Sequence, residues 1–405
     1  MMVRAGVKSA LAACLLLLAG LPVSAQFSDS DAATPIPACN LAAADAMQAG
    51  SGPGCRRAWQ DANIRLSDLQ LVGTAESYKQ EPSPALMSLI RMGGKKDAEA
   101  LDFGQAPIAA QLDAGARALQ FDIANDPKGG LFKRPAGASM AGELLDADYV
   151  AAMSRPGFKV IHVLDVDFRS SCISLKDCLT EVAAWSRAHK DHMPLMIALR
   201  TNDARTPMPG ATHPLPFDAA AFAALDKEVL SVFQPGEIIT PDMVQGKYAS
   251  LREAVTQHQW PTLSAARGKV VLVMDDCAQK VALYTGAMAK LSGRPMFVTA
   301  DENSPLASFI TIEDPVKDGA RIEAAVKAGF IVRTRADDQT REARTGNIAR
   351  REKAFASGAQ IVSTNFLEPD KRIGNYQVAM TNSRHALCNR AAAGLRCTGW
   401  NGEAN

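Results

Sequence analysis

The segment that decides the fold is residues 329–366, GFIVRTRADDQTREARTGNIARREKAFASGAQIVSTNF. It opens with the apolar run 329–334 and closes with the apolar run 359–364. Between these runs, residues 348–357 are rich in charged residues and alanine at helical spacing. Two strands that are continuous apolar runs, joined by a helix, are typical of a parallel sheet buried on both faces.

The same alternation runs through most of the chain. Further apolar runs occur at 69–74, 117–123, 159–164, 195–199, 269–274, 296–300 and 308–312, and further helical segments at 178–188, 217–233 and 321–328. We expect two stretches, 201–216 and 234–262, to be excursions between elements. Eight or nine strand–helix units over this length favour an α/β fold of the (β/α)₈ TIM-barrel type, with an open doubly wound sheet as the alternative.

The N-terminus predicts export. Arg4 and Lys8 precede the apolar stretch 10–21, and the small residues 23–25 provide a cleavage site. No later stretch is long enough for a transmembrane helix, so we expect the protein in the periplasm or outside the cell. The expected organisation is a signal peptide (1–25), a loosely held N-terminal arm (26–65), a single barrel domain (66–398) and a C-terminal tail (399–405).

Charge and cysteine content narrow the class of protein further. Lys and Arg number 44 and Asp and Glu 43, a balance that argues against a nucleic-acid partner or a polybasic membrane-binding surface. Export permits disulfides, and the close pairs Cys39/Cys55, Cys172/Cys178 and Cys388/Cys397 are plausible bridges that would leave Cys277 over. Spacing alone does not fix this connectivity.

Polar residues at the ends of apolar runs are the candidates for function, because catalytic groups in a barrel come from the C-terminal ends of its strands. Gln120 and Asp122 share a face of the second run. His162 lies within the third run, which Asp165 ends, and Arg200 ends the fourth. Each has a structural interpretation as well: a buried histidine that is hydrogen-bonded in the core, and a salt bridge between Arg200 and Asp122.

The two final runs add further candidates. Arg333, Arg335 and Asp337 have one parity along the run that begins at residue 329, and Ser363 and Asn365 have one parity along the run that begins at residue 359. The arginines could hold loops through carboxylates. However, buried charges need partners, and polar groups on several strand ends that converge at one end of a barrel favour a functional site.

These residues lie within motifs that resemble the secreted, calcium-dependent, phosphoinositide-specific phospholipase C family. The resemblance covers about 66–398 and is strongest in 329–366, then in HVLDVDFRSSCISLKDCLTEVAAWSRAH (162–189) and QLDAGARALQFDI (111–123). It implies a phosphoric diester hydrolase of lipid metabolism on a TIM barrel. In this family a bound calcium lowers the pKa of the inositol 2-hydroxyl, which then attacks the phosphate.

Carried over residue by residue, the resemblance departs from the family pattern at most of the chemical positions. After the first strand, Ala75 stands where the family has a catalytic histidine and Glu76 where it has a calcium-binding asparagine. On the second and fourth strands, Gln120 and Arg200 replace glutamate ligands. The family's second-strand aspartate and third-strand histidine are retained as Asp122 and His162, whereas Asn202, Asn347 and Asn365 are further departures.

The charge of the inferred metal site changes with these substitutions. The family's ligand set sums to −3, whereas Glu76, Gln120, Asp122 and Arg200 sum to −1. A guanidinium about 4 Å from a divalent ion would cost roughly 8 kcal/mol at an effective dielectric near 20. We therefore expect calcium to bind weakly or not at all, unless Arg200 swings away and Glu76, Asp122 and Asp165 form a shifted site.

Three functions are consistent with this pattern. The first is a possible pseudoenzyme that binds a phosphorylated small molecule or a phosphoinositide head group. In it Arg200 supplies the charge of the missing cation, and Arg333 or Arg335 provides bidentate contacts. The second is an active phosphodiesterase with a shifted metal site that uses His162. The third is a structural or interaction protein.

Overall fold

The computed structural model describes residues 39–405 except 51, 287–289, 381–383, 401–402 and 405. The signal peptide expected over 1–25 and the first part of the expected arm lie outside the described residues. Residues 39–405 form one compact unit, and the following description concerns this unit.

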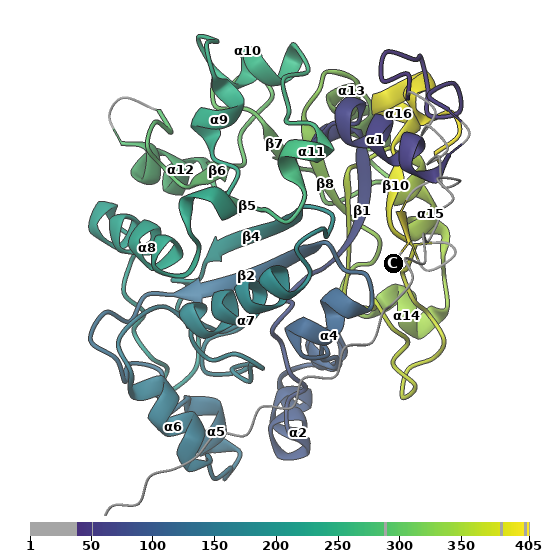
Figure 1. Ribbon diagram of the computed structural model, residues 1–405. Coiled ribbons are helices and arrows are strands. Elements are labelled where there is room, and N and C mark those ends of the chain that lie inside the picture. The colour runs from purple at the N-terminus through teal and green to yellow at the C-terminus, as the bar shows by residue number, and fades with distance from the viewer. Residues whose placement is uncertain (1–38, 51, 287–289, 381–383, 401–402, 405) are drawn as a thin grey trace, which may run out of the picture. The chain divides into compact units, whose positions relative to one another are not determined.

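Eight parallel strands form a barrel (Figure 1). They are β1 (Leu69–Thr74), β2 (Ala118–Ala124), β4 (Leu195–Thr201), β5 (Val270–Met274), β6 (Met296–Val298), β7 (Phe309–Thr311), β8 (Ile331–Arg335) and β9 (Ile361–Thr364). The order is β6-β5-β4-β2-β1-β9-β8-β7, with every neighbouring pair parallel. The sheet closes where Thr299, just after β6, forms a parallel bridge to Phe309. The predicted TIM-barrel fold is thus confirmed.

Helices alternate with these strands and cover the barrel. They are α1 (Pro53–Asn63), α2 (Pro84–Gly93), α3 (Lys95–Leu101), α4 (Ile108–Asp113), α5 (Ala136–Met140), α6 (Ala147–Ser154), α7 (Leu175–Ala188), α8 (Ala219–Val232), α9 (Pro241–Gln245), α10 (Leu251–Thr256), α11 (Leu263–Ala266), α12 (Ala278–Thr285), α13 (Gly319–Lys327), α14 (Arg341–Thr345), α15 (Ala349–Ala356) and α16 (Arg390–Ala393). Short 3₁₀ turns occupy Leu66–Asp68, Pro235–Glu237 and Gly394–Cys397.

Helix α7 illustrates how the sequence sets these elements. Ser174 caps its N-terminus by accepting a hydrogen bond from the backbone N–H of Asp177. Leu175, Leu179 and Val182, at three- and four-residue spacing, are buried against the barrel. The strands show the complementary pattern, because every residue of β1, β2 and β5 is buried, as expected for a parallel sheet covered on its outer face and filled inside.

The third apolar run is not a barrel strand, and here the prediction was wrong. In the run 159–164, β3 comprises Lys159–Val160 and pairs antiparallel with the end of β2. β4 is hydrogen-bonded directly to β2 over six residue pairs and so leaves no place for a strand between them. His162 therefore lies in a loop that folds over the end of β2. The amide of Asn202 holds this loop by donating to the backbone oxygens of Ile161 and His162, at 2.8 and 3.0 Å.

Two further strands lie outside the barrel. β10 (Arg384–Cys388) pairs antiparallel with the beginning of β1, and β11 (Glu403–Ala404) pairs with β10. The expected excursions agree with the structure: 201–216 contains no helix or strand beyond the end of β4, and 234–262 holds two short helices, α9 and α10, and a 3₁₀ turn. Both statements concern residues that the structure describes throughout.

The three disulfides considered from the sequence are present. Cys39 is bonded to Cys55, Cys172 to Cys178 and Cys388 to Cys397, while Cys277 is free and exposed. From residue 39 onward the arm is packed rather than loose, because Trp59 is 1% exposed and donates its indole N–H to the backbone oxygen of Ala43. Among the described residues, no helix combines the length and apolar character needed to cross a bilayer.

Candidate functional site at the barrel mouth

The barrel mouth, meaning the end at which the C-terminal ends of the eight strands lie, gathers most of the candidate residues. The chain turns sharply just after β1 at Glu76, which has a left-handed φ of 43° and is 6% exposed. This turn is fixed to β2, because the backbone N–H of Ser77 donates to the backbone oxygen of Gln120 at 3.0 Å. It brings the Glu76 carboxylate over the end of β2, where Asp122 lies.

Glu76, Asp122 and His162 form one cluster. Each offers one ligand atom, and these atoms all lie within 4.8 Å of one another. Asp122 accepts hydrogen bonds from the Tyr78 hydroxyl at 2.9 Å and from the Gln120 amide at 3.1 Å. Burial, and after it the charge of Glu76, raises the pKa of Asp122 above its ordinary value.

His162 is oriented by a buried carboxylate. Its Nδ1 lies 2.8 Å from Oδ2 of Asp167, which also lies 3.2 Å from Nζ of Lys79. A carboxylate only accepts, so Nδ1 carries the proton and Nε2 is left for another partner. Burial acts to lower the pKa of His162, but the hydrogen bond to Asp167 and the charges of Glu76 and Asp122 outweigh it and raise that pKa.

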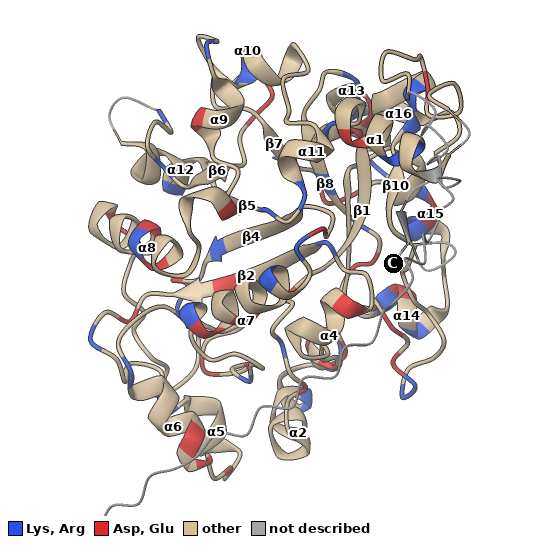
Figure 2. Ribbon diagram, in the orientation of Figure 1, with Lys and Arg blue, Asp and Glu red and all other residues tan. Residues whose placement is uncertain are grey.

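Arg200 lies beside this cluster on β4, with its Cα paired in register with that of Asp122 on β2. In Figure 2 the ribbon is blue at the end of β4 and red on β2. The side chain of Arg200 is 43% exposed, and its ion pair is with Glu313, at 3.9 Å. The salt bridge from Arg200 to Asp122 that the sequence suggested is not formed between these two described side chains, because the guanidinium extends across the barrel mouth instead.

Arg333 is buried and bound within the protein. It donates to Oδ2 of Asp275 at 3.1 Å, to the hydroxyl of Ser363 at 3.3 Å and to Oε1 of Gln120. Burial lowers its pKa below the ordinary value for arginine, and the charge of Asp275 acts in the opposite direction. Arg333 therefore joins β2, β8 and β9 to the residue that follows β5.

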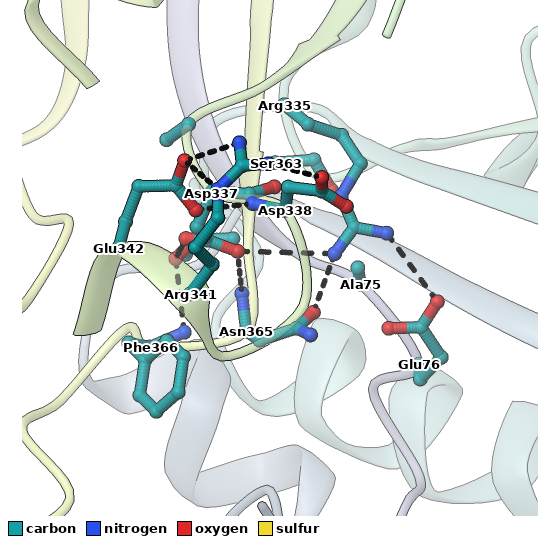
Figure 3. A network of polar contacts seen from close by, with 12 residues as sticks. Ala75, Glu76, Arg335, Asp337, Asp338, Arg341, Glu342, Ser363, Asn365 and Phe366 are labelled. Atoms are coloured by element: carbon teal, nitrogen blue, oxygen red, sulfur yellow. Dashed lines mark hydrogen bonds and ion pairs between the residues drawn. The ribbon is translucent and has the colours of Figure 1, made fainter. Parts of the chain in front are cut away.

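Arg335, two residues further along β8, is also bound to side chains of the protein. Its guanidinium lies 3.5 Å from Glu76 and donates to the side chain of Asn365 at 2.8 Å (Figure 3). Asp337 accepts from the backbone N–H of Asn365 at 2.9 Å and from the hydroxyl of Thr364, and burial raises its pKa to about 6. Arg333 and Arg335 are thus bound to carboxylates and amides at the barrel mouth, as in the structural interpretation of these residues.

Asp165 does not belong to the cluster. Its Oδ1 accepts from the backbone N–H of Ala136 and from the Thr212 hydroxyl, at 3.0 and 2.9 Å, and its Oδ2 accepts from the backbone N–H of Thr212 at 2.8 Å. Asp165 therefore fixes two loops to each other. The shifted metal site that would combine it with Glu76 and Asp122 is not formed, since the group found among the described residues has His162 as its third member.

A family model described as "Phosphoinositide phospholipase C, Ca2+-dependent" matches residues 64–390. The chain belongs to this phospholipase C family. The family covers the whole barrel, from the turn before β1 to the end of β10. No curated protein matches.

Solved structures of similar proteins include two bacterial enzymes. One is a calcium-dependent phosphoinositol-specific phospholipase C from the Gram-negative bacterium Pseudomonas sp., with 16% identity, a TM-score of 0.47, and 75% of this chain and 91% of that chain covered. The other is a calcium-dependent phosphatidylinositol-specific phospholipase C from Streptomyces antibioticus, with 15% identity, a TM-score of 0.46, and 74% and 94% covered.

In this member of the family, several residues of the site were not predicted from the sequence. Asp275 directly follows β5 and binds Arg333, so the rule of polar residues at strand ends would have found it. Asp167 was not predicted because the run 159–164 was assigned as a strand, and Asp167 lies beyond the end of that run. Its hydrogen bond with His162 depends on the loop that this segment forms instead. Tyr78 and Glu313 carry no signal in the sequence that separates them from other loop residues.

Proposed function

We propose that this family member binds a phosphorylated, anionic small molecule at the barrel mouth and does not carry out the calcium-dependent cleavage typical of its family. Arg200 is the residue that binds the phosphate. The observation that carries this proposal is the half-exposed guanidinium of Arg200, whose ion pair is a long one of 3.9 Å to an equally exposed Glu313. Such a pair is weak and easily exchanged for a dianionic phosphate.

The other two arginines support the site rather than contact the ligand in this proposal. The side chains of Arg333 and Arg335 are 8% and 12% exposed, and both are bound to carboxylates of the protein. Removing a buried arginine from its carboxylate leaves a buried charge without a partner, which is costly. We therefore assign to Arg200 the bidentate contact that the sequence suggested for Arg333 or Arg335. Ser363, Gln120 and Asp337 contact these two arginines, and together the five residues form a network within the protein, here called the frame.

The donor atoms of the cluster are poorly suited to calcium. Calcium prefers six to eight oxygen ligands, whereas the third member here is a histidine nitrogen. Both oxygens of Asp122 already accept hydrogen bonds, and Glu76 is paired with Arg335. Burial acts to raise the pKa of Glu76, but the charges of Arg335, His162, Arg333 and Arg200 outweigh it and lower that pKa. The three arginine charges would also repel a divalent cation.

A second candidate function is an active phosphodiesterase that uses His162. The observation in its favour is the hydrogen bond of 2.8 Å from Nδ1 of His162 to Asp167, which fixes the tautomer and orients the ring as in a general acid or base. Arg200 would stabilise the charge of the phosphate in such a reaction. Ala75 leaves no second histidine after β1, so this chemistry would lack the partner that the family uses.

Export is a further part of the proposal. Three disulfides within the described residues support an oxidising compartment, either the periplasm or the medium. The phosphorylated ligand would then be an extracellular or periplasmic molecule, such as a released phosphoinositide head group.

The test is calorimetric titration with inositol 1-phosphate in the presence of a chelator. We expect binding by the natural chain and a loss of about 10- to 100-fold in affinity in Arg200→Gln, the magnitude of a charged hydrogen bond. Arg187→Gln is the matched control, because Arg187 forms a partly exposed ion pair with Glu237, in the 3₁₀ turn that precedes α9. Equal affinities in the natural chain and in Arg200→Gln would contradict the proposal.

An assay of phosphatidylinositol hydrolysis separates the two candidates. Turnover in chelator that is lost in His162→Ala would favour the phosphodiesterase, and turnover that requires calcium would contradict the account of the metal site. Binding without turnover under either condition is the result that the proposal predicts.

A further inference from the structure

A cavity of about 600 Å³ lies at the barrel mouth, between the ends of β5, β6 and β7 and the helix α12. This volume is within the range of pockets that hold small organic ligands. Much of its wall is apolar: Ala278, Val281, Ala282, Ala300, Leu306 and Ile310. None of the functions described above uses it.

The cavity begins directly beside Arg200. The residue after β5, Asp275, lines the cavity and donates its backbone N–H to the backbone oxygen of Leu199, at 2.9 Å. The next residue, Asp276, also lines the cavity and accepts from the backbone N–H of Thr201 at 2.9 Å. The two lining residues are therefore bonded to Leu199 and Thr201, the residues on either side of Arg200 in β4.

The acidic groups next to Arg200 are already bound within the protein. Asp275 accepts from the Thr311 hydroxyl at 2.9 Å and from Arg333 at 3.1 Å. The carboxylate of Asp276 accepts from the backbone N–H groups of Thr201 and Cys277, at 2.9 and 2.8 Å. Two further charged residues line the cavity, and they have partners as well: Asp301 accepts from the amide of Asn303, and Arg321 donates to Glu302. Because these charged groups are bound within the protein, the apolar part of the wall is what remains for an uncharged group of a ligand.

We propose that this cavity receives an aliphatic substituent of a phosphate ester whose phosphate binds Arg200. The ligand class is thus an alkyl phosphate or alkyl phosphodiester, an anion with an apolar tail. The inference rests on the proposed function, because Arg200 must bind the phosphate for the tail to enter. The inference adds a basis for ligand selectivity, namely the length of the aliphatic substituent. Burial of hydrocarbon strengthens binding by about fourfold for each methylene group.

The experiment compares methyl phosphate, butyl phosphate and hexyl phosphate by calorimetric titration in chelator. Hexyl phosphate should bind at least tenfold more tightly than methyl phosphate to the natural chain, a lower bound on about fourfold per methylene group. Ala282→Phe, which places a ring in the cavity, should abolish this difference while leaving the affinity for methyl phosphate unchanged. Ala278→Phe on the same helix is a second variant, in case the first does not fold.

Ala188→Phe is the matched control. Ala188 lines a different cavity at the end of α7, near the opposite end of the barrel, so this variant should keep the full effect of chain length. Arg200→Gln should weaken the binding of all three esters by the same factor, because it removes the contact that they share.

The results separate the two proposals. If the esters bind in an Arg200-dependent manner but hexyl phosphate binds no more tightly than methyl phosphate, the cavity inference is overturned and the proposed function stands. If the effect of chain length persists in the folded phenylalanine variants, the tail binds elsewhere and the inference is likewise overturned. If no ester binds but inositol 1-phosphate does, the cavity inference is overturned and the proposed function stands. If neither the esters nor inositol 1-phosphate bind, both proposals fail.

Discussion

Nη1 of Arg335 lies 3.5 Å from Oε1 of Glu76, and this buried ion pair joins the end of β8 to the turn after β1. Their side chains are 12% and 8% exposed, respectively. The same guanidinium binds Asn365, so that a single arginine fixes three segments at the barrel mouth. Glu76 thus already has a partner within the protein, which is the main structural reason for not assigning it as a metal ligand.

Arg335→Gln should therefore destabilise the protein, because it leaves Glu76 buried without its cation. The expected loss in the free energy of unfolding is about 3 kcal/mol, measured by urea denaturation. Adding Glu76→Gln to this variant should restore part of the loss, since no buried charge then remains alone. Arg187→Gln, which breaks an exposed pair, should cost less than about 1 kcal/mol. A double variant that is no more stable than Arg335→Gln would refute the coupling.

Asp167 should control the protonation of His162. Burial acts to lower the pKa of His162, and the hydrogen bond that its Nδ1 donates to Asp167 helps to raise it, so Asp167→Asn should lower this pKa. NMR titration of the imidazole signals measures this directly. A folded-state pKa above the unfolded value stabilises the protein below the unfolded pKa, and this contribution is lost as the pH rises through the folded pKa. An unchanged titration in Asp167→Asn would show that Asp167 does not govern the ring.

A second histidine, His192, should make the protein sensitive to acid. Its Nε2 accepts from the Ser186 hydroxyl at 2.7 Å, and burial lowers its pKa to about 4. The neutral form is therefore favoured by folding, and stability on the order of 3 kcal/mol should be lost as the pH falls from about 6.5 to about 4. The melting temperature of His192→Gln should fall less steeply over this range than that of the natural chain. His213→Gln, at an exposed loop position, serves as the control.

Restoring the family pattern should restore a calcium site. The combined variant Ala75→His, Glu76→Asn, Gln120→Glu and Arg200→Glu changes the charge of the ligand set from −1 to −3. We expect it to bind calcium in calorimetric titration and to hydrolyse phosphatidylinositol, whereas the natural chain does neither. Circular dichroism must first show that the barrel is intact, because Arg335 loses its partner Glu76 in this variant. A folded variant that ignores calcium would mean that further residues prevent the site from forming.

The bridge Cys172–Cys178 should stabilise the loop that leads into α7. Closing a loop of this length contributes about 2 kcal/mol in the chain-entropy model, so Cys172→Ser with Cys178→Ser should lower the free energy of unfolding by about that amount. Cys277→Ser removes a thiol that is free and exposed, and should leave stability within about 0.5 kcal/mol of the natural chain. Equal stabilities of the two variants would argue against the bridge.

The barrel strands could be predicted from the sequence because parallel strands are uninterrupted apolar runs. The run 69–74 coincides with β1, and the run 269–274 begins one residue before β5. The run 159–164 was wrongly assigned as a barrel strand for the same reason. Val160 is buried in the main core, and Ile161 and Leu164 are buried in a separate apolar cluster. An apolar run indicates burial, and burial alone does not distinguish a loop from a strand.

The site could be predicted only in part. Residues on barrel strands, such as Asp122 and Arg200, were placed correctly because strand register fixes where they lie. The pairing of Arg335 with Glu76, and of His162 with Asp167, depends on loop conformations that carry no periodic signal. Sequence patterns therefore located the barrel mouth but could not tell which of its charges are bound within the protein.

The exposed thiol of Cys277 has a practical consequence. It precedes the first residue of α12 and adjoins Asp276 and Ala278, two residues that line the chamber beside Arg200. The other cysteines of the described residues are joined in disulfides, so within this part of the chain a maleimide dye should attach at Cys277. An environment-sensitive fluorophore at this thiol could report ligand binding in the neighbouring cavity without any engineered mutation.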